Sequence, residues 1–273
     1  MLAKVKLELR ENIATITLNR PKKKNALTFE MLQSLSEIGD TLKEDKALRC
    51  IIIRGAGGAF CSGIDINSFS FLASDKAFLQ SIMTPIRGKP YNKMQKPCMI
   101  WSEISVPVIA ALEGPVFGAG LQLALGADIR IAAPSAVLSV METKWGLIPD
   151  MGISQYLPKL VNYDQALLAT LTAKLIDASE AKNMGLVTIC SKKPYLHSLT
   201  LAKELLNKSP DATMSAKTLY KESWFEKNAT TLKLEAILQT KLIGSPNQME
   251  AVLANIEKRN PHFGIGESLN GKQ

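Results

Sequence analysis

An α/β core followed by a helical segment is the fold that this 273-residue sequence predicts. Two observations carry the prediction. Apolar runs typical of strands buried on both faces alternate with amphipathic helix patterns, which indicates layered ββα units. From about residue 196 onward, helix patterns follow one another. We therefore predict a core over residues 1–195 and a helical domain over residues 196–273.

The first elements are expected to be a hairpin, a helix and a buried strand. Apolar and charged residues alternate over residues 5–10, and apolar residues resume over residues 13–18, which is typical of a β-hairpin. Thr28 is a suitable N-cap for a helix that reaches about residue 45 with its leucines on one face. Residues 49–54 contain three successive isoleucines and predict a strand buried on both faces.

The middle of the chain contains a long apolar stretch, residues 106–127. Its length would suit a membrane span, but Pro107, Glu113 and several glycines interrupt it. A strand over residues 106–112 and a helix over residues 118–127 are expected instead. Before it, residues 68–104 have a mixed pattern in which helices are expected. After it, two short strands are expected over residues 128–132 and 137–140, and C-terminal helices over residues 196–208, 210–226, 230–243 and 247–259.

Composition limits the classes of function. The formal charge of +8 favours anionic partners but does not choose among nucleic acid, acidic membranes and phosphorylated small molecules. An aromatic content of 6% disfavours a surface that stacks single-stranded bases. Four scattered cysteines and two histidines form no zinc-binding pattern, so no metal is expected. Unclustered cysteines and an N-terminus unlike a signal peptide indicate a reducing compartment, expected to be the cytoplasm.

Two glycine-rich segments are candidates for chemistry. The first loop, residues 55–65, follows the buried strand, and the second, residues 113–122, joins a strand to the start of a helix. Backbone amides exposed in such segments can bind an anion or a developing oxyanion. Taken alone, each segment is also explained by an ordinary turn or by close packing of a helix on a sheet.

Five motifs follow one another between residues 5 and 190. They are Asn19-Arg20-Pro21 with Asn25-Ala26-Leu27; Phe60-Cys61-Ser62-Gly63-Ile64-Asp65; Gly118-Ala119-Gly120 with residues 127–132; Glu142 with Gly146-Leu147-Ile148-Pro149; and Ala181-Lys182-Asn183-Met184-Gly185-Leu186-Val187. Each motif alone is weak. In this order and spacing they resemble the enoyl-CoA hydratase/isomerase family, also called the crotonase family.

The resemblance implies a crotonase-like ββα spiral whose C-terminal helical domain supports a homotrimer or a hexamer. It also implies an acyl-CoA substrate that brings coenzyme A with it, and no separate cofactor. Family members hold the thioester oxygen with two backbone amides while an enolate forms, and the matching positions are Ser62 and Ala119. The other expected substrate contacts are Lys24, Ala26, Phe60, Gly63, Ile64, Asp65, Gly118 and Gln122, together with Ser62 itself.

The acid–base positions depart from the hydratase pattern. Hydratases in the family carry two glutamates, whereas this chain has Gln122 at the first position and Glu142 at the second. A single carboxylate suffices to move a proton between the γ- and α-carbons of an enoyl thioester, so double-bond isomerisation is expected, with hydration as the alternative. Asp150 matches an aspartate of dienoyl-CoA isomerases and is a further catalytic candidate. Its other interpretation is a turn residue that caps the next helix at Ile153.

A basic run, Lys22 to Lys24, follows the predicted hairpin. It either contacts the phosphates of coenzyme A or is an exposed loop, the usual place for a run of charges. Some crotonase relatives bind RNA, so a weakly active CoA- or RNA-binding relative is the rival to an enzyme. The low aromatic content disfavours nucleic acid as the main partner.

Overall fold

The computed structural model describes residues 3–68, 75–225 and 229–266. The strands are β1 (Val5–Arg10), β2 (Ile13–Leu18), β3 (Cys50–Gly55), β4 (Val108–Leu112), β5 (Pro115–Phe117), β6 (Ile129–Ala132), β7 (Val137–Ser139), β8 (Ile176–Asp177) and β9 (Ile189–Cys190). The longer helices are α1 (Phe29–Glu44), α3 (Lys76–Met83), α4 (Lys96–Glu103), α7 (Tyr163–Thr172), α9 (Pro194–Leu206), α10 (Pro210–Ser223), α11 (Ala229–Leu242) and α12 (Pro246–Glu257). The shorter ones are α5 (Ala119–Leu125), α6 (Ile153–Tyr156), α8 (Ala178–Met184), η1 (Pro21–Lys23), η2 (Glu142–Trp145) and η3 (Leu157–Lys159).

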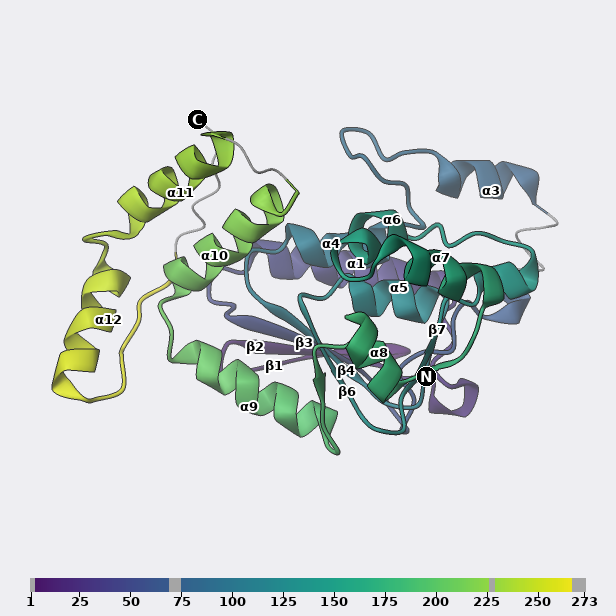
Figure 1. Cartoon of the computed structure of the whole chain (residues 1–273), viewed down its shortest axis with the longest axis horizontal. Coiled ribbons are helices and arrows are strands. Elements are labelled where there is room, and N and C mark those ends of the chain that lie inside the picture. Colours follow the sequence, from purple (N-terminus) through teal and green to yellow (C-terminus); the bar gives the residue numbers. More distant parts are fainter. Residues whose placement is uncertain (1–2, 69–74, 226–228, 267–273) are drawn as a thin grey trace.

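A six-stranded sheet in the order β1-β2-β3-β4-β6-β9 forms the centre of the molecule (Figure 1). β1 and β2 are the antiparallel hairpin, and every later neighbour in this sheet pairs in parallel. The register places Ile16 opposite Ile53, and Ile53 opposite Ala110. The strands of a smaller sheet, β5-β7-β8, alternate along the chain with the later strands of the large sheet. Parallel strands place their carboxyl ends at one edge, where the two glycine-rich loops begin.

Both faces of the large sheet are covered, as continuous apolar strands require. Successive side chains of β3 point to opposite faces, so Ile51 and Ile53 join the larger core, under α1, α4 and α5. Ile52 points the other way and packs with Ile109 and with Ala202 of α9. Figure 1 shows α9 on the side of the sheet opposite α1, α4 and α5. The molecule is therefore a three-layer α/β arrangement around its sheet.

The expected domain boundary between residues 195 and 196 falls inside α9, after its second residue. Because α9 supplies the second covering layer of the sheet, it is packed with the core rather than with the helices that follow. The chain leaves the sheet only after Leu206, and α10, α11 and α12 form a separate group of helices in Figure 1. Lys217 of α10 ties that group to the core through an ion pair with Asp128 of 2.7 Å.

The hairpin, the helix after Thr28, the strands and the helix near residue 120 that were predicted before residue 140 are confirmed. Thr28 caps α1, because its hydroxyl oxygen accepts a hydrogen bond from the Met31 amide at 3.3 Å. The apolar stretch of residues 106–127 folds into β4, β5 and α5. Of the stretch 68–104, residues 69–74 lie outside the described residues, and α3 and α4 are its helices. Within the described ranges, no helix combines the length and the apolar character that a membrane crossing needs.

Candidate active site

A buried asparagine clamps the first loop (residues 55–65). Asn25 is 0% exposed, and its side-chain amide donates to the carbonyl oxygens of Ala56 and Ala59 at 3.0 and 2.7 Å. Its side-chain oxygen accepts from the Arg20 amide at 2.8 Å. The motif that contains Asn25 identified the residue but gave it no role. A fully satisfied buried amide of this kind fixes the shape of the loop that carries the backbone donors.

Asp65 is the last residue of the first loop, and its side chain forms an ion pair. Its carboxylate lies 3.0 Å from the Arg20 guanidinium, and the same guanidinium donates to the Ala26 carbonyl oxygen at 2.5 Å. Both charged side chains are mostly buried. The expected substrate contacts Asp65 and Ala26 are therefore joined through Arg20, and Asp65 acts in holding the loop. Phe60, another expected contact, is fully buried in the core, so its side chain supports the loop from beneath.

The first loop lies against the second loop (residues 113–122). The Cys61 amide donates to the Pro115 carbonyl oxygen, and the Phe117 amide donates to the Cys61 carbonyl oxygen, both at 3.0 Å. At Gly120 the approach is so close that a Cβ atom would lie 2.6 Å from the Cys61 carbonyl oxygen. Glycine is therefore required where α5 begins, and the two loops form one backbone surface.

The structure revises which amide of the first loop is free. The Ser62 amide donates to the Lys24 carbonyl oxygen at 3.0 Å, so it is not available to a substrate oxygen. Gly63 and Asp65 both bond with Leu27, and the amide between them, that of Ile64, points away from Leu27. Among the described residues, the Ile64 amide has no hydrogen-bond acceptor.

The second expected donor keeps its amide free. Ala119 is the first residue of α5, and the first amides of a helix have no intrahelical partner. No acceptor within the described chain takes the Ala119 N–H. The residue before it, Gly118, has a φ of +51°, and a Cβ atom there would lie 3.3 Å from Glu142 Oε1. The free amide of Ala119 and the carboxylate of Glu142 are therefore close neighbours.

Glu142 is held by Gln122. The Gln122 side-chain amide donates to Glu142 Oε1 at 2.6 Å, and its oxygen accepts from the Met151 amide at 2.7 Å. Glu142 Oε2 is buried and makes no hydrogen bond with the described residues. Burial raises the pKa of Glu142; the Gln122 hydrogen bond lowers this pKa, and the neighbouring Asp150 raises it. A carboxyl group with a raised pKa and one unpartnered oxygen suits a general base.

Asp150 lies beside Glu142 and does not cap a helix. The N-cap position of α6 is Gly152, in a left-handed conformation, and no side chain caps that helix. The capping interpretation of Asp150 is therefore wrong. Its side chain is exposed, and partial removal from water by the surrounding protein raises the pKa of Asp150. The structure thus brings together Gln122, Glu142 and Asp150 at the start of α5.

The basic run is exposed next to the first loop. Lys22 and Lys23 belong to η1, and Lys24 follows in a left-handed conformation with a φ of +46°. The Lys24 carbonyl oxygen accepts the Ser62 amide, which joins the basic run to the first loop. The described residues contain no group of three or more histidine, cysteine, aspartate or glutamate side chains placed to hold a metal ion.

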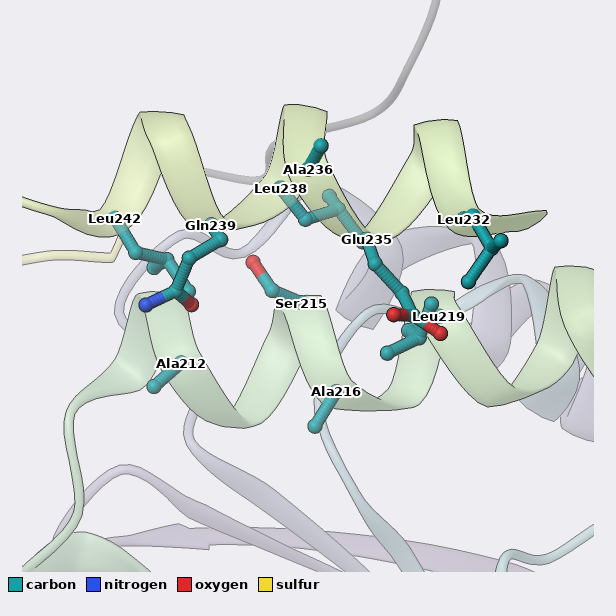
Figure 2. Close-up of a pocket in the computed structure, with 10 residues that line it drawn as sticks. All are labelled: Ala212, Ser215, Ala216, Leu219, Leu232, Glu235, Ala236, Leu238, Gln239 and Leu242. Atoms are coloured by element: carbon teal, nitrogen blue, oxygen red, sulfur yellow. The ribbon is translucent and has the colours of Figure 1, made fainter. Parts of the chain in front are cut away.

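A groove lies away from these loops. Figure 2 shows it between α10 and α11, with a volume of about 690 Å³ and with the side chains of Ser215, Glu235 and Gln239 among its lining. A second hollow of about 410 Å³ is lined by Arg130, Tyr156 and residues of α10. Neither hollow is lined by Glu142 or by residues of the two loops.

A family model described as enoyl-CoA hydratase/isomerase matches residues 8–266. The chain belongs to the enoyl-CoA hydratase/isomerase family. It is 33% identical over 263 residues to a mitochondrial methylglutaconyl-CoA hydratase of Mus musculus, which covers 94% of the chain and 81% of that protein. It is 31% identical to a peroxisomal Delta(3,5)-Delta(2,4)-dienoyl-CoA isomerase of Arabidopsis thaliana, with 91% of each covered.

The solved structure of an enoyl-CoA hydratase from Bacillus anthracis superimposes with a TM-score of 0.86 at 27% identity, covering 96% of the chain and 99% of that structure. The predicted crotonase fold is confirmed, and the chain is an enzyme of the enoyl-CoA hydratase/isomerase family. Its relatives are named both as hydratases and as isomerases, so membership leaves the reaction open. Some are mitochondrial, and the cytoplasmic location stays a prediction.

Proposed function

We propose that this enoyl-CoA hydratase/isomerase moves the double bond of an enoyl-CoA thioester by a proton transfer that uses one base, Glu142. The observation that carries the proposal is the pairing of Glu142 with a glutamine instead of a second carboxylate. An amide bonded on both sides, as Gln122 is, cannot take a proton from water. Net hydration is therefore disfavoured.

The free amides of Ile64 and Ala119 are the proposed donors to the thioester carbonyl oxygen. Glu142 Oε2 removes a proton from the α-carbon of a 3-enoyl-CoA, so that the C–H bond breaks and a carboxyl O–H bond forms. The electron pair of the C–H bond delocalises onto the thioester oxygen, where the two N–H groups stabilise the negative charge, and through the C3=C4 double bond onto the γ-carbon. Glu142 then returns the proton to the γ-carbon, which yields the 2-enoyl-CoA and restores the carboxylate.

The test compares the wild type with Glu142→Gln on a 3-enoyl-CoA and a 2-enoyl-CoA in D2O. General-base catalysis contributes about a hundred- to ten-thousand-fold, so Glu142→Gln should lose isomerisation and α-proton exchange by such a factor. Incorporation of deuterium without net addition of water supports the one-base scheme. If the wild type hydrates 2-enoyl-CoA fast and Glu142→Gln still isomerises, the scheme is wrong and Asp150 becomes the leading base.

Hydration is the second candidate, because relatives such as the murine and Bacillus proteins are named hydratases. Gln122→Glu offers a direct comparison, since it creates the second carboxylate that hydration needs. We expect this variant to gain hydration of 2-enoyl-CoA. A wild type that already hydrates as fast as Gln122→Glu would favour the hydratase.

A further inference from the structure

Both ends of the Gln122 side-chain amide are fixed, which determines its orientation. A backbone N–H can only donate, so the atom that faces Met151 must be the side-chain oxygen. The NH2 group consequently faces Glu142 Oε1. The residue is 1% exposed, and rotation of the amide would leave the buried Met151 amide without an acceptor.

This orientation makes the two oxygens of Glu142 unequal. Oε1 lies 2.6 Å from an N–H donor, so a proton on Oε1 would meet the proton of Gln122. Oε2 is buried and has no partner among the described residues, and it can carry a proton without that conflict. The two oxygens of an exposed carboxylate would instead exchange freely by rotation.

We propose that Gln122 is a positioning residue: it holds Glu142 by Oε1, stabilises the carboxylate and directs the transferred proton to Oε2. The inference rests on the proposed function only for the role of Glu142 as the base. Gln122 touches the base and need not touch the reacting carbons.

The charged groups around Glu142 determine the direction in which its pKa should shift when Gln122 is replaced. Asp150, on the segment that follows η2, is the negative charge that bears on Glu142, and the Cys98 thiol of α4 is also in electrostatic contact with it. The hydrogen bond that joins α7 to η2 involves uncharged groups, the Thr143 hydroxyl and the Thr170 carbonyl oxygen. Gln122 is thus the group from α5 that favours the ionised form, so its removal should raise the pKa of Glu142.

The experiment measures the ionisation of Glu142 directly. The ¹³C NMR signal of its carboxyl carbon is identified by its loss in Glu142→Gln and is titrated in the wild type, Gln122→Met and Gln122→Asn. Methionine keeps the length without the amide, and asparagine is one methylene shorter. The pH profile of deuterium exchange into a 3-enoyl-CoA is recorded in parallel. Gln155→Met, on the exposed surface of α6, is the matched control.

In both Gln122 variants, the Glu142 titration and the ascending limb of the exchange profile should move to higher pH by about one unit. A shift of that size corresponds to the loss of one hydrogen bond to the charged carboxylate. The maximal exchange rate should fall more than KM changes, because Gln122 is bonded to Glu142 and Met151 and the proposed thioester donors, the Ile64 and Ala119 amides, stay in place. Gln155→Met should match the wild type. Folded Gln122 variants whose Glu142 titrates as in the wild type would overturn the inference. A different result separates the two proposals. If the Glu142 titration moves in the Gln122 variants but Glu142→Gln still exchanges deuterium, the proposed function is overturned, while the effect of the Gln122 hydrogen bond on Glu142 stands.

Discussion

Asp150 acts on Glu142 in the opposite direction to Gln122, since its charge raises the pKa of Glu142. Replacing it with asparagine removes a negative charge and should lower that pKa. Glu142 would then lose its proton at lower pH, so the ascending limb of the isomerisation profile should move to lower pH in Asp150→Asn. A pH series of kcat/KM on a 3-enoyl-CoA measures the shift.

The size of the rate change tells two roles of Asp150 apart. If Asp150 affects Glu142 only through its charge, the maximal rate should change little. If it is a second acid, Asp150→Asn should be as damaging as Glu142→Gln, a loss of about a hundredfold or more. An unmoved pH profile with a wild-type rate would remove Asp150 from the site.

At the scale of elements, the start of α5 carries a backbone donor that a single substitution can delete. Ala119→Pro removes the N–H, and proline is tolerated in the first turn of a helix. Loss of one oxyanion donor costs about a hundredfold or more in turnover. A steady-state assay beside a thermal unfolding curve measures both effects. A folded variant with unchanged turnover would show that the Ala119 amide is not a donor to the substrate.

The basic run at η1 is the proposed contact for the phosphates of coenzyme A. Alanine is suitable at Lys22 and Lys23, but Lys24 has a left-handed backbone, which asparagine tolerates better. The triple variant Lys22→Ala, Lys23→Ala, Lys24→Asn should raise KM for CoA thioesters and leave pantetheine thioesters unaffected, because only CoA has the nucleotide phosphates. Equal effects on both substrates would contradict the contact.

The sequence predicted the elements before residue 140 well because their patterns are long and regular. The four predicted C-terminal helices match α9, α10, α11 and α12 for the same reason. Between residues 142 and 190, most elements are only two to four residues long, as β8 is, and so short a segment shows no periodicity in its sequence. The site was predicted in outline. Ser62 was the wrong choice for a free amide, because its hydrogen bond joins it to Lys24, a contact 38 positions away that no local pattern reveals. The hydrogen bond between Gln122 and Met151 joins residues 29 positions apart, which no local pattern reveals either.

For the whole molecule, exposed apolar side chains on α7 support assembly. Tyr163 is 81% exposed and Leu171 is 64% exposed, with Leu167, Leu168 and Leu175 nearby in the chain. A surface of this kind commonly marks a protein interface. We expect sedimentation equilibrium to give a trimer or a hexamer.

If copies of the chain assemble through α7, two carboxylates placed on this helix should weaken the assembly, because they would be buried without partners. The double variant Leu168→Glu, Leu171→Glu should therefore shift the sedimentation profile toward smaller species. Leu9→Glu, an equally exposed leucine on β1, is the matched control and should not change the mass. A monomeric wild type, or a variant with unchanged mass, would contradict assembly through α7.

The two ends of the large sheet have a consequence for how copies of the chain meet. β1 lies at one end and presents Lys6, Glu8 and Arg10 along a six-residue strand, and β9 at the other end has two residues. Edge strands that are charged or very short resist pairing with a strand of another chain, which is the first step of amyloid-like growth. Newly made copies at high concentration are therefore less prone to pair sheet edge to sheet edge.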